Sequence, residues 1–129
     1  MSNVNANPAN IDSGSIEASR VNGTKVYNRA GEHLGSIHDL VIGKRDGKVK
    51  YAIMSFGGFL GMGEDYHPLP WEKLDYEPRQ GGYVVDVDKA RLEGAPHYGN
   101  DKSPDWNDHD YGRKVDDYYG VDQAGTRRL

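Results

Sequence analysis

The stretch from Gly31 to Trp71 constrains the fold more than any other part of the chain, because its pattern predicts a long β-hairpin with a return strand. Two apolar segments flank a turn that contains Asp46-Gly47, and Asp-Gly between such segments is typical of a tight hairpin. A glycine-rich apolar loop, Gly57–Gly63, follows, and His67–Trp71 can then run back along the hairpin. The sequence therefore predicts a β-sheet protein built around this hairpin.

The first strand of the hairpin, Leu34–Ile42, contains a break in its alternation of apolar side chains. Ile37 lies an odd number of residues from both Leu40 and Ile42, so a regular strand would point it to the opposite face. A β-bulge inserts one extra residue into a strand and corrects such a mismatch. We therefore predict a bulge at His38-Asp39 that turns all three apolar side chains inward.

The remaining elements are short. Val49–Phe56 is apolar on both faces, so it should be a central strand whose outer face is covered by the tail or by another subunit. His67–Trp71 contains two prolines, which cannot donate to a neighbouring strand, and is therefore predicted as an edge or irregular strand. Asp88 can cap a short helix over Lys89–Glu93 that ends at Gly94. Five or six short strands and one helical turn predict an all-β fold, a small antiparallel barrel.

The composition divides the chain into three parts. Residues 1–19 are rich in Asn and Ser and poor in apolar side chains, which predicts a flexible leader. Residues 20–94 hold the strand patterns and form the predicted barrel, whereas residues 95–129 are acidic and aromatic. A single helical turn between Gly112 and Gly120 would present one apolar face. We expect this tail to fold back on the barrel or to dock onto a neighbour, and to fray at its end.

Charge and composition exclude several classes of protein. The predicted barrel carries eleven basic and eleven acidic residues, and the leader and tail bring the net charge to −4. No basic stripe is present, so direct binding to nucleic acid is disfavoured. The chain has no cysteine, which excludes disulfides and thiolate metal sites. Neither a signal segment nor an apolar run of about 18 residues occurs, so we expect a cytoplasmic protein that does not insert into membranes.

No motif in the sequence indicates a catalytic centre. The Gly57–Gly63 loop lacks the Gly-Lys-Ser/Thr of a phosphate-binding loop, and a proline-containing strand follows it in place of a helix. The five histidines are scattered without metal-binding spacing, and the acidic tail does not match a calcium-binding loop. No serine lies in a nucleophile elbow. We therefore expect no catalytic residue, no metal and no cofactor, and a protein that is not an enzyme.

Four segments between Ser19 and Tyr119 resemble the PRC-barrel family, which includes the cytoplasmic domain of the photosynthetic reaction centre H subunit and the C-terminal domain of a ribosome maturation factor. They are RVNGTKVYNRAGEHLGSIHDLVI, YAIMSFGGFLGMGEDYHPLPWEKL, GYVVDVDKARLEGAP and DWNDHDYGRKVDDYYG. The resemblance is to the stand-alone branch of the family. It implies a PRC-type β-barrel and a role in binding, because members share the barrel and not a reaction.

The resemblance and the composition together favour a non-catalytic adaptor or docking module that binds a protein partner, with a homodimer as one form of that association. Two alternatives remain open. One is a small-molecule or ion sensor, and the other is an accessory subunit of a photosynthetic electron-transfer complex. In the second case the titratable groups near the hairpin, His38, Asp39, Glu64, Asp65 and His67, would be candidates for proton transfer.

Large aromatic and aliphatic side chains supply most of the free energy of protein interfaces, and they are the expected contact residues. These residues are Phe59, Leu60, Met62, Tyr66, Trp71, Trp106, Tyr118 and Tyr119. Three of them lie in the glycine-rich loop, which either plugs one end of the barrel or forms an exposed apolar tip.

Overall fold

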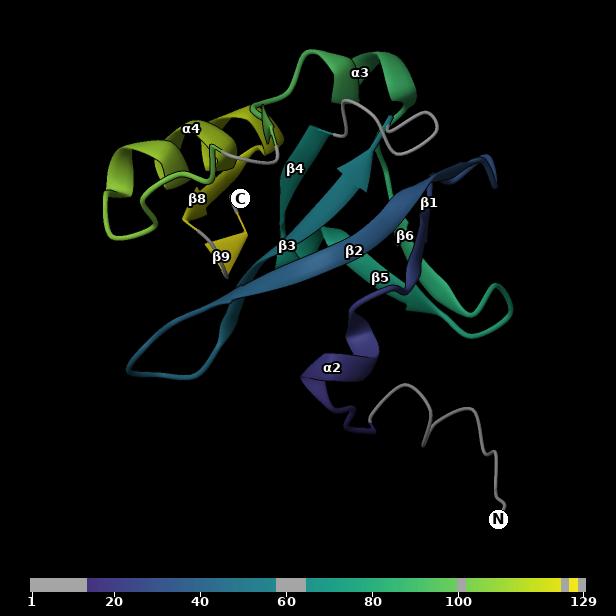
Figure 1. Cartoon of the computed structure of the whole chain (residues 1–129). Helices are drawn as coiled ribbons and strands as arrows, with labels where there is room; N and C mark the ends of the chain where they lie inside the picture. Colours follow the sequence, from purple (N-terminus) through teal and green to yellow (C-terminus); the bar gives the residue numbers. More distant parts are fainter. Residues whose placement is uncertain (1–13, 58–64, 100–101, 124–125, 128–129) are drawn as a thin grey trace.

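The computed structural model describes residues 14–57, 65–99, 102–123 and 126–127 (Figure 1). The strands are β1 (Lys25–Tyr27), β2 (His33–Ile42), β3 (Val49–Phe56), β4 (Asp65–Pro70), β5 (Leu74–Glu77), β6 (Gly82–Val85), β7 (Tyr98–Gly99), β8 (Val121–Gln123) and β9 (Thr126–Arg127). The helices are α2 (Ala18–Val21), the 3₁₀ helix η2 (Trp71–Lys73), α3 (Lys89–Glu93) and α4 (His109–Tyr119).

Within the described residues, seven strands form one sheet in the order β5-β6-β1-β2-β3-β4-β7, and β8 pairs with β9 separately. This corrects the prediction of five or six strands. A two-residue strand such as β7 carries no sequence pattern, so only its pairing with β4 reveals it. The prediction of a purely antiparallel barrel also needs correction, because β1 and β6 run parallel and the sheet is not closed.

The 3₁₀ helix η2 lies at the opening of the sheet. It joins β4 to β5, two strands that are consecutive in sequence but lie near opposite ends of the strand order. The ring of Trp71 packs against Tyr83 of β6 with a centroid distance of 5.4 Å. Trp71 thereby links the two sides of the opening.

The predicted hairpin is confirmed, and its turn has the expected backbone conformation. Gly47 has a φ angle of 70°, in the left-handed region that favours glycine. The side chain of Asp46 accepts a hydrogen bond from the backbone N–H of Lys48 at 3.0 Å. The turn therefore sets the register of β2 against β3.

The predicted bulge in β2 is also confirmed. The pairing of β2 with β3 shifts register between Ile37 and Asp39. Ile37 is 1% exposed and Leu40 is half-buried, as the bulge requires. Ile42, in contrast, is 47% exposed, which corrects the expectation that it points inward. It lies at the end of β2, next to the exposed turn.

The prolines of β4 lie in the part of the strand that, among the described strands, pairs only with β3. β4 pairs with β3 along all six of its residues, but it pairs with β7 only at Asp65 and Tyr66. Pro68 and Pro70 therefore have a strand partner on one side only, in agreement with the predicted edge strand.

The central strand β3 separates two packed layers. Inside the curved sheet, its Ala52 and Met54 belong to the main apolar core, which is formed by buried side chains. The most deeply buried of these side chains are Val26, Ile37, Met54, Leu69, Val85, Leu92 and Val115. On the outer face of β3, Tyr51 contacts the C-terminal part of the chain. The α4 helix covers the sheet on this side (Figure 1).

Helix α4 is longer than the single turn that the sequence predicts. It begins after Asp108, whose side chain accepts a hydrogen bond from the backbone N–H of Asp110, and ends at Gly120 in the left-handed conformation. Val115 and Tyr119 are buried against the core, which favours the helix despite its modest intrinsic propensity.

The short helix α3 forms as predicted and is fastened to α4. Asp88 accepts a hydrogen bond from the backbone N–H of Arg91 at 2.8 Å. The guanidinium of Arg91 lies over the ring of Tyr118 at 4.6 Å from its centroid and donates to the carbonyl oxygen of Tyr118. In return, the hydroxyl of Tyr118 donates to the carbonyl oxygen of Arg91. The two helices thus form one cover over the same end of the sheet.

Candidate functional site

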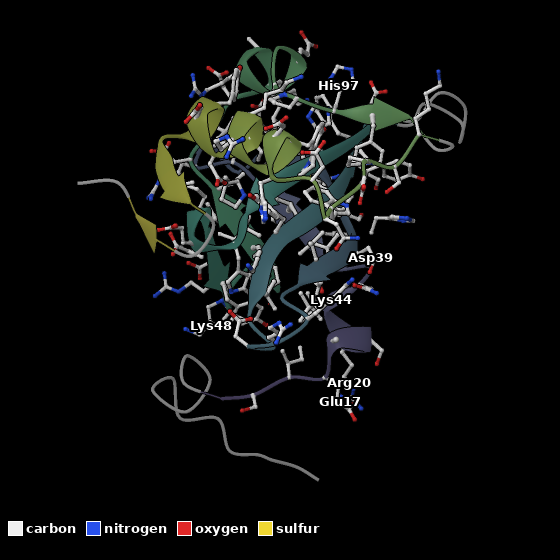
Figure 2. The ribbon with its side chains drawn as sticks, turned by 90° about the vertical axis from the view of Figure 1, so that its left-hand side faces the viewer. Glu17, Arg20, Asp39, Lys44, Lys48 and His97 are labelled. Carbon is white, nitrogen blue, oxygen red and sulfur yellow. The ribbon has the colours of Figure 1, made fainter. Side chains whose placement is uncertain are left out.

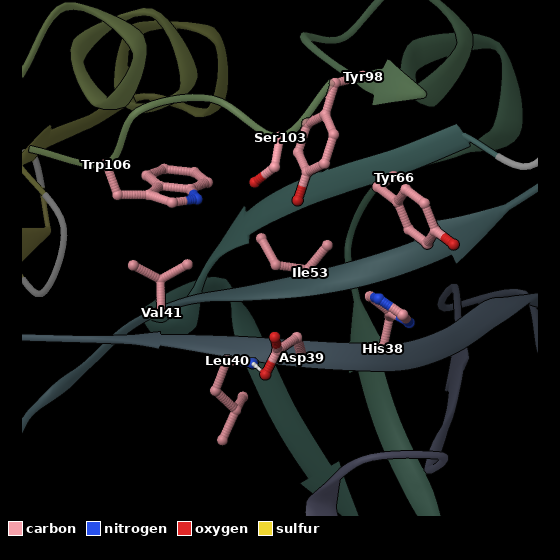
Figure 3. Close-up of a pocket in the computed structure, with 9 residues that line it drawn as sticks. All are labelled: His38, Asp39, Leu40, Val41, Ile53, Tyr66, Tyr98, Ser103 and Trp106. Atoms are coloured by element: carbon pink, nitrogen blue, oxygen red, sulfur yellow. Dashed lines mark hydrogen bonds between the residues drawn. The ribbon is translucent and has the colours of Figure 1, made fainter. Parts of the chain in front are cut away.

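An aromatic groove of about 310 Å³ lies on the outer face of the sheet, between the central strands and the segment that leads to α4 (Figure 3). Its lining residues come from β2, β3, β4, β7 and residues 103–106. They are His38, Asp39, Leu40, Val41, Ile53, Tyr66, Tyr98, Ser103 and Trp106. We call this feature the outer groove.

The bulge in β2 supplies the polar side of the outer groove. In a regular strand, His38 and Asp39 would point to opposite faces, and Asp39 would be directed into the core. The bulge instead leaves both side chains exposed, while Ile37 remains buried. Figure 3 shows the side chain of Leu40 on the other side of β2 from that of His38. A local irregularity of one strand thus brings an imidazole and a carboxylate to the groove.

Aromatic rings form a continuous series of contacts along the groove and behind it. His38 packs on Tyr66 at a centroid distance of 4.5 Å, and Tyr66 packs on Tyr98 at 5.7 Å. At the other end, Trp106 contacts Tyr51 at 5.2 Å. Tyr111 of α4 contacts both Tyr98 and Trp106, at 6.4 and 5.5 Å. The series connects β2 with α4, so the groove wall is held by packing from both the sheet and the tail.

Asp39 is the acidic group of the outer groove. Its carboxylate accepts a hydrogen bond from the backbone N–H of Leu40 at 2.8 Å and is exposed to solvent. The ion pairs found among the described residues are Arg20–Glu17, Arg29–Asp86 and Arg113–Asp110, and Asp39 takes part in none of them. Figure 2 shows Asp39 well away from Glu17 and Arg20.

The electrostatic effect of Asp39 reaches the tyrosine on the opposite wall. Burial is the main cause that raises the pKa of Tyr98, and a hydrogen bond with Ser103 opposes this shift. The negative charge of Asp39 and the proximity of Tyr66 raise the pKa of Tyr98 further. Tyr98 is therefore a neutral hydroxyl near a free carboxylate, and the groove can offer hydrogen-bond acceptors and aromatic faces to a ligand.

A second contact holds the tail in place beside the groove. The hydroxyl of Tyr51 donates to the carboxylate of Asp116 at 2.8 Å, in a buried position. It also lies 3.3 Å from the carbonyl oxygen of Gly112. A Cβ atom at Gly112 would lie 3.0 Å from the Tyr51 hydroxyl, so glycine permits the close approach of α4 to β3.

Of the eight predicted contact residues, the structure brings two into the outer groove, Tyr66 and Trp106. Tyr66 is only 6% exposed and Tyr119 only 5%, so their side chains offer little area to a partner. Trp71 lies at the sheet opening, and Tyr118 faces Arg91. Phe59, Leu60 and Met62 lie outside the described residues, and the choice between plug and interface for their loop stays a prediction.

The sequence reasoning did not place Val41, Tyr98 or Ser103 at a site, and it assigned His38 and Asp39 only to a possible proton path. The predicted bulge was a signal that could have found His38 and Asp39, because a bulge is a common way to re-aim side chains at functional sites. Tyr98 and Ser103 precede α4 in a segment without a pattern, so only the tertiary structure brings them to β4.

A stacked histidine pair lies apart from the outer groove. His67 is 1% exposed, its Nδ1 has no hydrogen-bond partner among the described residues, and its ring stacks on that of His97 at 5.1 Å. Burial chiefly, and the neighbouring His97 in addition, lower the pKa of His67 to about 4, whereas Asp65 opposes this shift. His97 itself is anchored by a contact of 2.9 Å between its Nδ1 and the carbonyl oxygen of Ala95. In the described part of the chain, no three His, Asp or Glu residues are grouped so that they could hold a metal ion.

The curved, partly open sheet of seven strands, with short helices packed on it, is consistent with a PRC-type β-barrel fold. Among the helices of the described residues, none has the length and apolar character needed to cross a bilayer. The sequence matches the family profile described as PRC-barrel domain over residues 13–92, and the chain therefore belongs to the PRC-barrel family. No curated protein matches this chain.

Proposed function

We propose that this protein is a non-catalytic docking module that binds a segment of a partner protein in the outer groove. The observation that carries this proposal is the groove itself, a preformed hollow lined by aromatic and aliphatic side chains with a few polar groups. Interface hot spots are enriched in such aromatic side chains, and a concave apolar surface provides the water-excluded contact that they need.

The packing around the groove supports the same function. Aromatic contacts from β2 to α4 hold the walls in place, so a partner segment would meet a surface that is already ordered. A preformed surface lowers the conformational entropy that binding costs. Val41 and Trp106 remain half-exposed within this ordered wall and provide the apolar area.

The test is an affinity capture with the tagged full-length chain in cells that naturally produce it, followed by quantitative mass spectrometry. Val41→Lys places a positive charge in the groove, whereas Ile42→Lys places the same charge on the next residue, which is exposed and does not line the groove. We expect the partner to be retained by the wild type and by Ile42→Lys and lost with Val41→Lys. Binding of the purified partner should then show the same order by calorimetry. Equal capture by all three proteins would refute a docking role for the groove.

A small-molecule sensor is the second candidate, and the size of the groove favours it. Its volume of about 310 Å³ lies at the lower end of the range of small-ligand pockets. Native mass spectrometry of the protein purified from its own cells would detect a retained ligand. A ligand mass that is lost in Val41→Lys and kept in Ile42→Lys would favour the sensor over the docking module.

A further inference from the structure

We propose that the outer groove recognises an arginine side chain of the partner segment, whose guanidinium stacks between the aromatic walls and pairs with Asp39. This inference rests on the proposed docking function and specifies the chemistry of the partner. It is drawn from the combination of two partly exposed aromatic side chains, Tyr98 and Trp106, with one carboxylate in a single groove.

The carboxylate is available for a cation. Asp39 is exposed and belongs to none of the ion pairs formed among the described residues, and its contact with the N–H of Leu40 uses only one of its lone pairs. The other titratable groups on the groove walls are the imidazole of His38 and the hydroxyls of Tyr66 and Tyr98. The described groove thus has one full negative charge and no lysine or arginine in its lining.

The aromatic walls favour a planar cation. Tyr98 and Trp106, both partly exposed, line the groove together with Asp39, whereas Tyr66 beside them is only 6% exposed. The negative faces of aromatic rings attract cations, with tryptophan the strongest of the three ring types. A guanidinium also stacks on flat rings and forms two parallel hydrogen bonds with a carboxylate, whereas a lysine ammonium acts as a point charge. Arginine therefore fits this set of groups better than lysine does.

Elsewhere in the chain, an arginine side chain already packs over an aromatic ring. The guanidinium of Arg91 lies over the ring of Tyr118 at 4.6 Å, in an exposed position. In the outer groove, the partly exposed rings of Tyr98 and Trp106 and the carboxylate of Asp39 border a hollow that no described cation occupies. The net charge of the chain is −4, so long-range electrostatic forces do not repel a basic partner.

The test is a titration of the ¹⁵N-labelled full-length protein with the peptide acetyl-Gly-Arg-Gly-amide, followed by NMR. The matched peptides contain citrulline, which keeps the shape of arginine without its charge, or lysine in the central position. We expect the arginine peptide to shift the indole N–H signal of Trp106 and the amide signals of residues 38–41. A Trp71→Phe variant assigns the two indole signals, since the chain has two tryptophans.

Two protein variants and the citrulline peptide test the contribution of charge while the shape of each side chain is nearly kept. Asp39→Asn should weaken binding of the arginine peptide roughly tenfold or more, because it removes the negative charge and one of the two acceptor oxygens that would pair with the guanidinium. Asp75→Asn removes an exposed carboxylate on β5, outside the groove, and should leave binding unchanged. The citrulline peptide should bind at least about tenfold more weakly than the arginine peptide.

Equal binding of the citrulline and arginine peptides, an unchanged affinity in Asp39→Asn, or no shift of the Trp106 signal at the highest peptide concentration would overturn the arginine proposal. The partner capture described above distinguishes this failure from a failure of the docking function. If Val41→Lys still loses the partner while Asp39→Asn keeps it, the groove docks a neutral segment. If both variants keep the partner, both proposals fall.

Discussion

The hydroxyl of Tyr51 donates a hydrogen bond to the carboxylate of Asp116 at 2.8 Å, which joins the central strand β3 to helix α4 across 65 residues of sequence. Both side chains are buried, at 5% and 4% exposure. A buried carboxylate is stable only when it is hydrogen-bonded or paired. The position of α4, and with it one wall of the outer groove, therefore depends on this contact.

Tyr51→Phe should destabilise the protein by about 1–3 kcal/mol, because it removes a donor from the buried carboxylate of Asp116 while keeping the ring that packs on Trp106. Chemical denaturation measures the change in the free energy of unfolding. Tyr76→Phe is the matched control, since Tyr76 is 44% exposed, and it should have little effect. If both variants unfold at the same denaturant concentration, the hydrogen bond does not stabilise the tail.

The protein should lose stability in acid through His67. Its folded-state pKa of about 4 lies below the usual value of 6.5, chiefly because of burial, so the unfolded chain binds a proton that the folded chain does not. The free energy of unfolding is therefore unaffected by His67 above about pH 6.5. It falls as the pH drops towards 4, by on the order of 3 kcal/mol.

Denaturation at several pH values between 7 and 4 tests this prediction. His67→Leu should flatten the pH dependence in this window, whereas His109→Gln, which changes an exposed histidine, should preserve it. An identical acid slope in the wild type and in His67→Leu would show that another group causes the loss.

Gly47→Val should cost roughly 1–3 kcal/mol, because a β-branched residue resists the φ angle of 70° at the hairpin turn. No atom lies within 4 Å of a Cβ built at Gly47, so the cost comes from the backbone alone. Gly47→Asn should cost less, since asparagine tolerates the left-handed region. Thermal unfolding of the two variants measures the difference. A valine variant as stable as the asparagine variant would argue against a left-handed residue at this turn.

Truncation after Pro96 should remove most of the stability of the protein. It deletes Val115, Tyr119 and Val121, each of which is buried against the rest of the fold. Burial of one such side chain stabilises by about 1.5–3 kcal/mol, so their combined loss is comparable to the whole stability of a small domain. Calorimetry should show a much lower melting temperature or no cooperative transition. A truncated protein that melts like the full chain would mean that the tail does not stabilise the barrel.

Local sequence patterns were sufficient to predict the elements whose conformation depends on residues close in sequence. The Asp46-Gly47 turn, the bulge at His38-Asp39 and the cap of α3 by Asp88 are confirmed, because each depends on backbone preferences or contacts within a few residues. The family resemblance is confirmed over residues 13–92, the part of the chain that holds this turn, this bulge and this cap.

The tertiary structure alone decided the parallel pairing of β1 with β6, the full length of α4 and the outer groove. Each depends on residues that are distant in sequence: Val26 with Tyr83, Tyr51 with Asp116, and Asp39 with Tyr98. A helix with a glycine and several aspartates is weak by propensity, and the burial of Val115 and Tyr119 stabilises it together with the contact of Asp116 to Tyr51. The sequence by itself determined the hairpin, its bulge and α3. Long-range packing determined strands such as β7 and how the elements meet to form a site, because the free energy of such contacts appears only when the chain is folded.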